Sequence, residues 1–282
     1  MKFLTIFVLS ACALSANAQT TLRYQMKPGE KLQYRTSNSV DISTTQMGTQ
    51  QEMKLSTKAV FDINAEKIEG ENMVFTNAFK SCATNVKMPS QGVKDSTIKL
   101  TAIVGKRTRV TMTPFGKVIS TKIVDTPNID EQLMLVLSQN ASELTNIWTE
   151  FGSNPVKPGD TWKVQQKDSN DAPGNGKVYT TKNIKYYYLR NADTLKHTCA
   201  VIEYTLDISV EGGFKNPVPP GNELTVDGDG NGSGTIYIDA AQGKIIADNN
   251  KLDANQSLSI PGQSDPVLTS TKTVTSHLAI VE

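Results

Sequence analysis

The sequence predicts a mainly β fold of the α+β class: a curved antiparallel sheet or half-barrel of about a dozen strands, wrapped on a central helical segment. The first observation behind this prediction is that apolar and polar residues alternate with a period of two outside residues 126–152. The second is that apolar residues within 126–152 recur at steps of three and four. A sheet of that many strands must curl, split or close, and curling around an amphipathic helix buries both apolar surfaces.

Residues 1–18 have the pattern of a signal peptide. Lys2 precedes an apolar run over residues 3–9, and an Ala-Asn-Ala tripeptide before Gln19 fits a small-residue cleavage site. As an alternative, the tetrapeptide that ends at Cys12 resembles a bacterial lipobox, in which Cys12 would carry a lipid anchor. Both interpretations predict export to the periplasm or the extracellular space. No later stretch approaches the roughly 20 apolar residues of a transmembrane helix, so we expect no membrane span.

The composition argues against several kinds of partner and chemistry. With 29 basic and 28 acidic residues, the chain has a formal net charge of +1, so we expect no nucleic-acid partner. The two histidines, His197 and His277, lie outside any Gly-flanked nucleophile turn or zinc-binding pattern. We therefore expect a non-enzymatic protein with no cofactor, apart from the weak calcium site considered below.

Two cysteines, Cys82 and Cys199, lie in strand-like segments after the leader. A pair of cysteines in an exported protein can form a disulfide. Buried free thiols are also common in strands. The sequence leaves both possibilities open.

The first half, residues 19–125, is expected to form successive antiparallel strands. Leu22, Tyr24 and Met26 alternate with polar residues before a Lys-Pro-Gly-Glu turn at 27–30. Polar side chains on the second face of these strands predict a sheet that is covered on one side only. The apolar residues of 98–112 share one parity, which predicts a single long strand there.

The central segment, residues 126–152, is the one place where the spacing predicts a helix. Asn128 followed by Glu131 fits a capping box, and Gly152 marks a stop. A second Asn-x-x-Glu at 140–143 leaves open a division into two shorter helices. The apolar stripe comprises Met134, Leu137, Ala141, Leu144, Trp148 and Phe151.

The second half, residues 155–282, repeats the turn chemistry of the first. Lys-Pro-Gly-Asp at 157–160 corresponds to the turn at 27–30, and two further short motifs recur at offsets near 127 residues (191−64 and 243−116). We expect a single domain over 19–282 made of two similar halves, which suggests an internal duplication. The alternative is independent reuse of similar turns. Residues 211–234 are rich in Gly and Pro and are predicted to form a loop.

Within that loop, residues 227–234 suggest a metal site. Asp227, Asp229 and Asn231 match the first oxygen ligands of an EF-hand calcium loop, and Gly232 matches the glycine that follows them. The twelfth position, where a bidentate Glu belongs, is Ile238. The pattern therefore predicts at most weak calcium binding, and the alternative is an ordinary turn-rich connection.

The long antiparallel strands with one wet face and a helical plug resemble the half-barrel of periplasmic lipoprotein carriers. The turn at 113–117 and the Pro-Gly-Asp-Thr-Trp segment at 158–162 also resemble a family of secreted bacterial proteins of unassigned function. In the lipoprotein carriers, the concave face and its helical lid hold an acyl chain. The resemblance therefore implies an apolar cavity and carries no catalytic residue across.

We expect an exported protein that holds a lipid or another hydrophobic ligand between sheet and helix. The alternative is a structural or protein-interaction module of the cell envelope, with a packed core and no ligand. The residues expected to line the cleft are Met134, Leu137, Leu144, Trp148 and Phe151 on the helix side, and Phe61, Phe75, Ile98, Leu100 and Val104 on the sheet side.

Overall fold

The computed structural model describes residues 19–46, 48–89, 93–124, 147–172, 176–215, 221–263 and 265–281. Most of these residues lie in strands. The strands are β1 (Lys31–Gln46), β2 (Thr49–Glu69), β3 (Asn72–Met88), β4 (Val93–Lys99), β5 (Arg107–Met112), β6 (Val118–Ile123), β7 (Thr161–Ala172), β8 (Gly176–Thr194), β9 (His197–Lys215), β10 (Glu223–Asp239), β11 (Lys244–Ser259) and β12 (Leu268–Ile280), with a 3₁₀ helix η2 (Thr101–Ile103) before β5. No helix in this part of the chain is long and apolar enough to cross a membrane.

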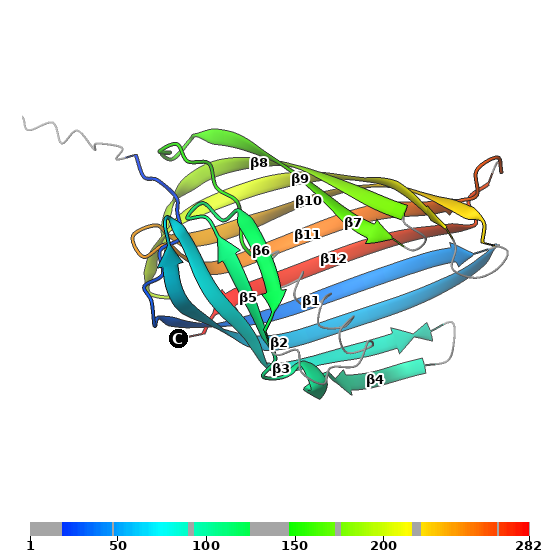
Figure 1. The fold of residues 1–282 in the computed structure, drawn as a ribbon, viewed down its shortest axis with the longest axis horizontal. Coiled ribbons are helices and arrows are strands. Elements are labelled where there is room, and N and C mark those ends of the chain that lie inside the picture. Colours follow the sequence, from blue (N-terminus) through cyan, green and yellow to red (C-terminus); the bar gives the residue numbers. More distant parts are fainter. Residues whose placement is uncertain are drawn as a thin grey trace, which may run out of the picture.

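All twelve strands belong to one antiparallel sheet. Its order is β6-β5-β3-β2-β1-β12-β11-β10-β9-β8-β7, and β4 pairs with the part of β3 that β5 leaves free. The two halves of the chain meet where β1 pairs with β12, so they share one sheet. The sheet curls, and β5 and β6 lie in front of the long strands at one end (Figure 1). The prediction of a curved antiparallel sheet or half-barrel of about a dozen strands is confirmed.

The α+β class and the central helical segment are wrong. The fold is all-β, and the described residues contain no α-helix. Residues 147–152, which are the described end of the predicted helix, form a turn and an irregular segment, whereas residues 125–146 lie outside the described residues. Trp148 and Phe151 have helical spacing, but both rings pack on Tyr24 from this irregular backbone. A spacing of three residues in a short segment therefore reflected a shared packing partner rather than a helix.

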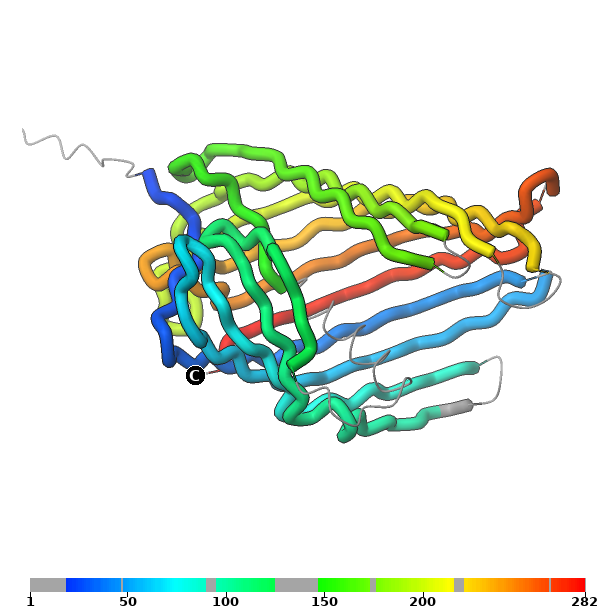
Figure 2. Tube along the Cα trace, in the orientation of Figure 1, coloured from blue at the N-terminus to red at the C-terminus, as the bar shows by residue number. Residues whose placement is uncertain are grey.

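The hydrophobic core lies at one end of the sheet, which we call the core end. It is the end that carries the β2–β3, β8–β9 and β10–β11 turns, and β5 and β6 (green) lie in front of the other strands there (Figure 2). Large side chains from both halves are fully buried there, because the curled sheet brings its own inner face together. They include Tyr34, Phe61, Phe75, Ile63, Met112, Ile202, Ile236 and Ile245.

An extended N-terminal segment, residues 20–26, closes the core end. Leu22, Tyr24 and Met26 are buried, as the alternation predicted for an inward-facing set. The Tyr24 N–H donates to the carbonyl of Pro114 in the β5–β6 turn at 2.7 Å, and the Gln25 N–H donates to Gly243 in the β10–β11 turn at 3.1 Å. The segment therefore connects the β5–β6 turn of the first half with the β10–β11 turn of the second half.

The two Lys-Pro-Gly-acid turns have the same geometry. The N–H of Gly29 donates to the Ala65 carbonyl at 2.9 Å, and the N–H of Gly159 donates to the Tyr188 carbonyl at 2.7 Å. Both glycines have positive φ, 83° and 95°, a conformation that glycine adopts without steric cost. A shift of register follows each acceptor residue. The geometry agrees with an internal duplication, which stays a prediction.

Two predicted segments differ from the structure. The single strand over 98–112 is wrong, because β4 ends at Lys99 and Gly105, at φ 76°, turns the chain before β5 begins. The loop over 211–234 is also wrong, because β9 continues to Lys215 and β10 begins at Glu223. Alternate glycines within β10 lie on the concave face of the sheet, where a strongly curled strand has little room for side chains.

Candidate ligand-binding face

Beyond the core end, the inner face of the sheet carries a continuous row of apolar residues, which we call the apolar row. Cross-strand pairing places its members side by side on nine neighbouring strands, from β7 through β12 and β1 to β3. The members are Val164, Ile184, Leu206, Gly232, Leu252, Val274, Val40, Leu55 and Val86. All are half-buried, whereas their outward-facing neighbours on β7 to β10 are exposed.

The row one step closer to the core is polar and aromatic, and we call it the polar row. Two residues along a strand correspond to about 6.6–6.8 Å, so the two rows are adjacent on the same face. Its members are Trp162, Tyr186, Tyr204, Gly234, Asn250, Ser276, Asn38, Thr57 and Thr84. Trp162 stacks on Tyr186 with ring centroids 5.2 Å apart, and Tyr186 lies 5.9 Å from Tyr204. This half of the polar row is therefore a cluster of packed aromatic rings.

The absence of a side chain at Gly234 leaves space for the Tyr204 ring of this cluster. A Cβ atom at this position would lie 2.6 Å from the hydroxyl oxygen of Tyr204 and 2.7 Å from the carbonyl oxygen of Asn249. Both distances are too short for a carbon atom, so the Tyr204 ring occupies the space that a side chain on β10 would take.

Asp248 brings a carboxyl group into this mostly apolar interior. It pairs with Ile236 on one side and Leu278 on the other, both of which are buried. Burial raises the pKa of Asp248 to about 6, against a hydrogen bond from Asn250 that lowers it. Among the described residues, its Oδ1 atom is buried without a hydrogen-bond partner. A buried carboxyl with a raised pKa is the kind of group found at functional sites and was not singled out by the sequence.

Asp248 also affects the tyrosines of the polar row. Burial, and then the Asp248 carboxylate, raise the pKa values of Tyr186 and Tyr204 above the ordinary phenol value. Asn250 hydrogen-bonds to the side chains of both Tyr204 and Asp248. The neutral phenols, the amide and the carboxyl therefore form a polar cluster between the core and the apolar row.

The seven described residues predicted to line a cleft are not brought together on one surface. Phe61, Phe75, Trp148 and Phe151 belong to the packed core, and Leu100 is half-buried against it. Ile98 and Val104, on the two sides of η2, are exposed at 49% and 39%. The remaining three, Met134, Leu137 and Leu144, lie outside the described residues.

The residues predicted to bind calcium lie in the middle of β10. Asp227, Asp229 and Asn231 alternate with glycines that face inward, so their side chains form a row on the outer face of an extended strand. Alternate residues of a strand are about 6.6–6.8 Å apart, whereas an EF-hand loop folds its ligands around one ion. No cluster of three or more His, Cys, Asp or Glu side chains suited to a metal occurs in the described residues. Calcium binding stays a prediction, and the three residues do not form a loop that would surround an ion.

The cysteines and histidines play local roles. Cys82 and Cys199 are both buried, and no disulfide joins the two. Burial raises the pKa of Cys199 to about 11, which disfavours the reactive thiolate. His197 contacts Asp239 at 2.9 Å, and Asp239 also accepts the N–H groups of Ala241 and Gln242 in the β10–β11 turn. His277 hydrogen-bonds to Asn249 on the outer face.

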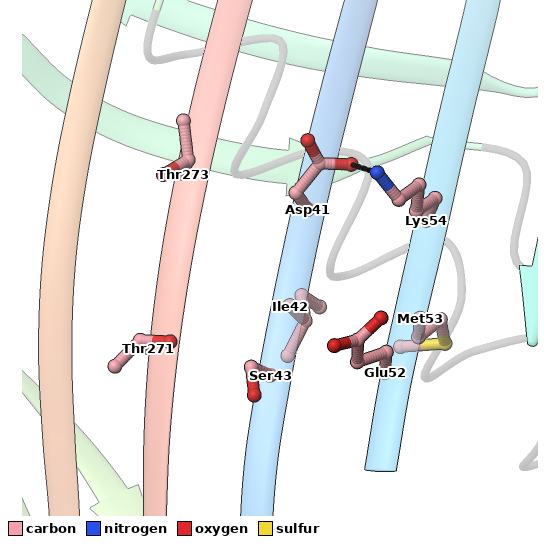
Figure 3. A pocket seen from close by; sticks show the side chains of 8 residues that line it. All are labelled: Asp41, Ile42, Ser43, Glu52, Met53, Lys54, Thr271 and Thr273. Atoms are coloured by element: carbon pink, nitrogen blue, oxygen red, sulfur yellow. Dashed lines mark ion pairs between the residues drawn. The ribbon is translucent and has the colours of Figure 1, made fainter. Parts of the chain in front are cut away.

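A shallow depression of about 230 Å³ lies across β1, β2 and β12 near the far end of the sheet. Figure 3 shows its side chains, among them Lys54 and Asp41, whose charged atoms are 3.8 Å apart. Both side chains are more than half exposed, and six of the eight lining residues are polar or charged. This depression has the character of ordinary wet surface.

No protein-family profile and no curated protein matches the chain. Among solved structures, the chain is similar to a protein from Bacteroides fragilis described as exported with a YmcC-like fold (10% identity, 93% of this chain and 100% of that chain, TM-score 0.25). It is also similar to OccK7 of Pseudomonas aeruginosa (6% identity, 90% and 100% coverage, TM-score 0.33). A third match is an outer membrane channel from Pseudomonas putida F1 (8% identity, 92% and 98% coverage, TM-score 0.28).

These similarities carry no argument about function, because the identities and TM-scores are low. They do not show a relationship to lipoprotein carriers, which the sequence suggested. We assign the half-barrel from the pairing of the strands in this chain.

Proposed function

We propose that the protein is an exported, non-enzymatic binding protein that holds a hydrophobic ligand on the inner face of its sheet. The observation that carries the proposal is the apolar row, which is nine strands wide and half-buried, and in which only Val164 and Ile184 are among the residues packed against the core cluster of the described chain. A continuous apolar surface of this kind is expected to be covered by a partner or ligand, since leaving it in water is unfavourable. The leader-like residues 1–18 support export.

The form of the surface favours an extended ligand. The apolar row follows the curl of the sheet across the strands, so it presents a curved strip rather than a compact hole. Alkyl chains suit such a strip because they make dispersion contacts along their whole length and need no hydrogen bonds. The polar row lies beside the strip and gives polar groups of the ligand or bound water a place to contact.

Organic extraction and native mass spectrometry of the purified mature protein test the proposal. We expect co-purified lipid in the wild type and less of it in Leu206→Asn, which places an amide in the middle of the apolar row. The matched control is Thr205→Asn, which faces outward on the same strand and is exposed. Absence of lipid from repeated preparations, together with no binding of added alkyl probes, would instead favour a structural or interaction module of the envelope.

A further inference from the structure

We propose that the ligand is an anionic amphiphile and that Lys182 and Lys272 receive its head group. This inference rests on the proposed function and adds the chemical class of the ligand. It concerns the row of inner-face residues on the side of the apolar row away from the core, which we call the lysine row. Its members are Gln166, Lys182, Ile208, Gly230, Ala254, Lys272, Ile42 and Met53.

The two lysines adjoin the apolar row directly. Lys182 is two residues from Ile184 on β8, and Lys272 is two residues from Val274 on β12. Side chains two apart on a strand lie on the same face, about 6.6–6.8 Å from each other. An alkyl chain on the apolar row can therefore place a head group at either ammonium.

Lys182 and Lys272 are the charged residues within the three rows. The apolar row and the polar row contain no ionisable acid or base apart from tyrosine, and the charged members of the lysine row are both lysines. Two acids lie beside these lysine-row residues: Glu150 accepts a hydrogen bond at 3.3 Å from Gln166, which pairs with Lys182, and the Oδ2 of Asp168 lies 3.9 Å from Lys182 Nζ. That separation is longer than a hydrogen bond, so the ammonium has donors left for another anion.

The outer face shows a different arrangement. There, Lys251 and Lys87 have closer acidic partners, Asp253 at 2.9 Å and Asp95 at 3.0 Å. Lys182 is also less exposed than these lysines, at 25% for its side chain against 58% and 47%. Partial burial of a lysine beside an apolar strip costs free energy unless its ammonium group contacts an anion or another polar partner.

Protection of sheet edges does not explain the two lysines. Inward-pointing charges are one device by which proteins keep edge strands from pairing with other chains. However, β8 lies between β7 and β9, and β12 lies between β11 and β1, so neither is an edge. Recognition of a negative group is the explanation that fits their position, because each lysine adjoins the apolar row, Lys182 half-buried and Lys272 exposed.

The test measures binding of alkyl probes to the mature protein by titration calorimetry. The probes share one chain and differ in the head group: dodecanoate, dodecyl phosphate, neutral dodecanol and cationic dodecyltrimethylammonium. We expect the two anions to bind most tightly, and their binding to weaken as salt is raised, since charges partly exposed to solvent are screened. The stronger of the two anions then distinguishes a carboxylate from a phosphate head group.

The variant Lys182→Gln/Lys272→Gln is expected to weaken anion binding by about tenfold or more and to leave dodecanol binding unchanged. The control Lys185→Gln/Lys251→Gln removes the same charge from exposed outer-face positions and should change neither. Equal binding of all four probes, or a preference for the cation, would overturn the inference while supporting the proposed function. Failure of every probe to bind would overturn both.

Discussion

The hydroxyl group of Tyr24 makes two hydrogen bonds with the backbone of Thr149: its oxygen lies 2.9 Å from the Thr149 nitrogen and 3.2 Å from the Thr149 carbonyl oxygen. These residues are 125 positions apart. The contact joins the N-terminal segment to the irregular segment that precedes β7. Tyr24 is buried, and its ring also packs on Trp148 and Phe151. It therefore links the two segments that cover the core end.

Removing that hydroxyl is expected to destabilise the protein. In Tyr24→Phe, the ring contacts stay while the N–H and the carbonyl of Thr149 lose their partner. An unsatisfied buried polar group costs about 1–3 kcal/mol of unfolding free energy. Urea denaturation measures the loss, with Tyr187→Phe, a partly exposed tyrosine on the outer face, as the control. A Tyr24→Phe variant as stable as the wild type would show that this contact does not support the core.

Trp148 is expected to be an anchor of the core. Its ring centroid is 5.0 Å from that of Tyr24 and 4.9 Å from that of Phe75, and the residue is 6% exposed. Replacing it with alanine leaves a cavity, which for a buried tryptophan costs about 3–5 kcal/mol. Ile119→Ala, at an exposed position of β6, is the control and should have little effect. A loss below about 1 kcal/mol for Trp148→Ala would mean that the ring faces solvent or an open space.

Substitutions in the β8–β9 turn are expected to stabilise the protein. Leu195 and Lys196 have φ values of 47° and 64°, and they form the two-residue loop between the paired residues Thr194 and His197. A left-handed conformation costs about 1–2 kcal/mol for an ordinary residue, whereas Asn-Gly suits this hairpin. We expect Leu195→Asn/Lys196→Gly to raise the melting temperature.

The β2–β3 turn offers the reverse experiment. Gly70 has a φ of 61° and open space around it, so Gly70→Ala adds backbone strain without a clash. This substitution should lower the melting temperature. A turn variant at 195–196 that melts no higher than the wild type would indicate that its backbone adapts without strain.

Gly234 is expected to be intolerant of alanine. Gly→Ala at a compatible position stabilises by about 0.4–1 kcal/mol, because it restricts the unfolded chain. Here the added methyl would meet Tyr204 and the Asn249 carbonyl, and overpacking typically costs about 1–3 kcal/mol, so the steric term is the larger. Guanidinium denaturation should show a net loss, and Ser233→Ala, exposed on the outer face, should show little change. A stabilised Gly234→Ala would contradict the placement of the Tyr204 ring.

Asp248 is expected to make stability depend on pH. Its pKa is raised from 3.8 to about 6 in the folded protein, so the folded state binds the proton more tightly than the unfolded state. The protonated carboxyl is thus favoured by folding, and stability is lost as pH rises from about 4 to about 6. A shift of two pKa units corresponds to about 3 kcal/mol.

Denaturation curves at a series of pH values measure this effect. Asp248→Asn, which has the same shape and cannot ionise, should remove most of the fall in stability between pH 4 and 6. Asp229→Asn removes one carboxylate from the outer face of the neighbouring strand and is the matched control. An unchanged pH dependence in Asp248→Asn would show that its carboxyl is solvated in the folded protein.

The inward face of several strands could be predicted from the sequence alone. The alternation of Leu22, Tyr24 and Met26, and of the apolar residues of β9, is a local property, because successive side chains of a strand point to opposite faces whatever the strand pairs with. The turns at Gly29 and Gly159 were also local, since a positive φ favours glycine in any fold. These features were sufficient to predict a curved antiparallel sheet.

The alignment of those faces depends on long-range packing. Val40 lies beside Val274, and Leu206 lies beside Gly232, because of a register set by packing along the whole sheet. The apolar row, the lysine row and the position of Asp248 follow from this register, which no short stretch of sequence encodes. The same reason explains the error at Trp148 and Phe151: their spacing matched a helix, but their conformation was decided by Tyr24, a partner more than 120 residues away.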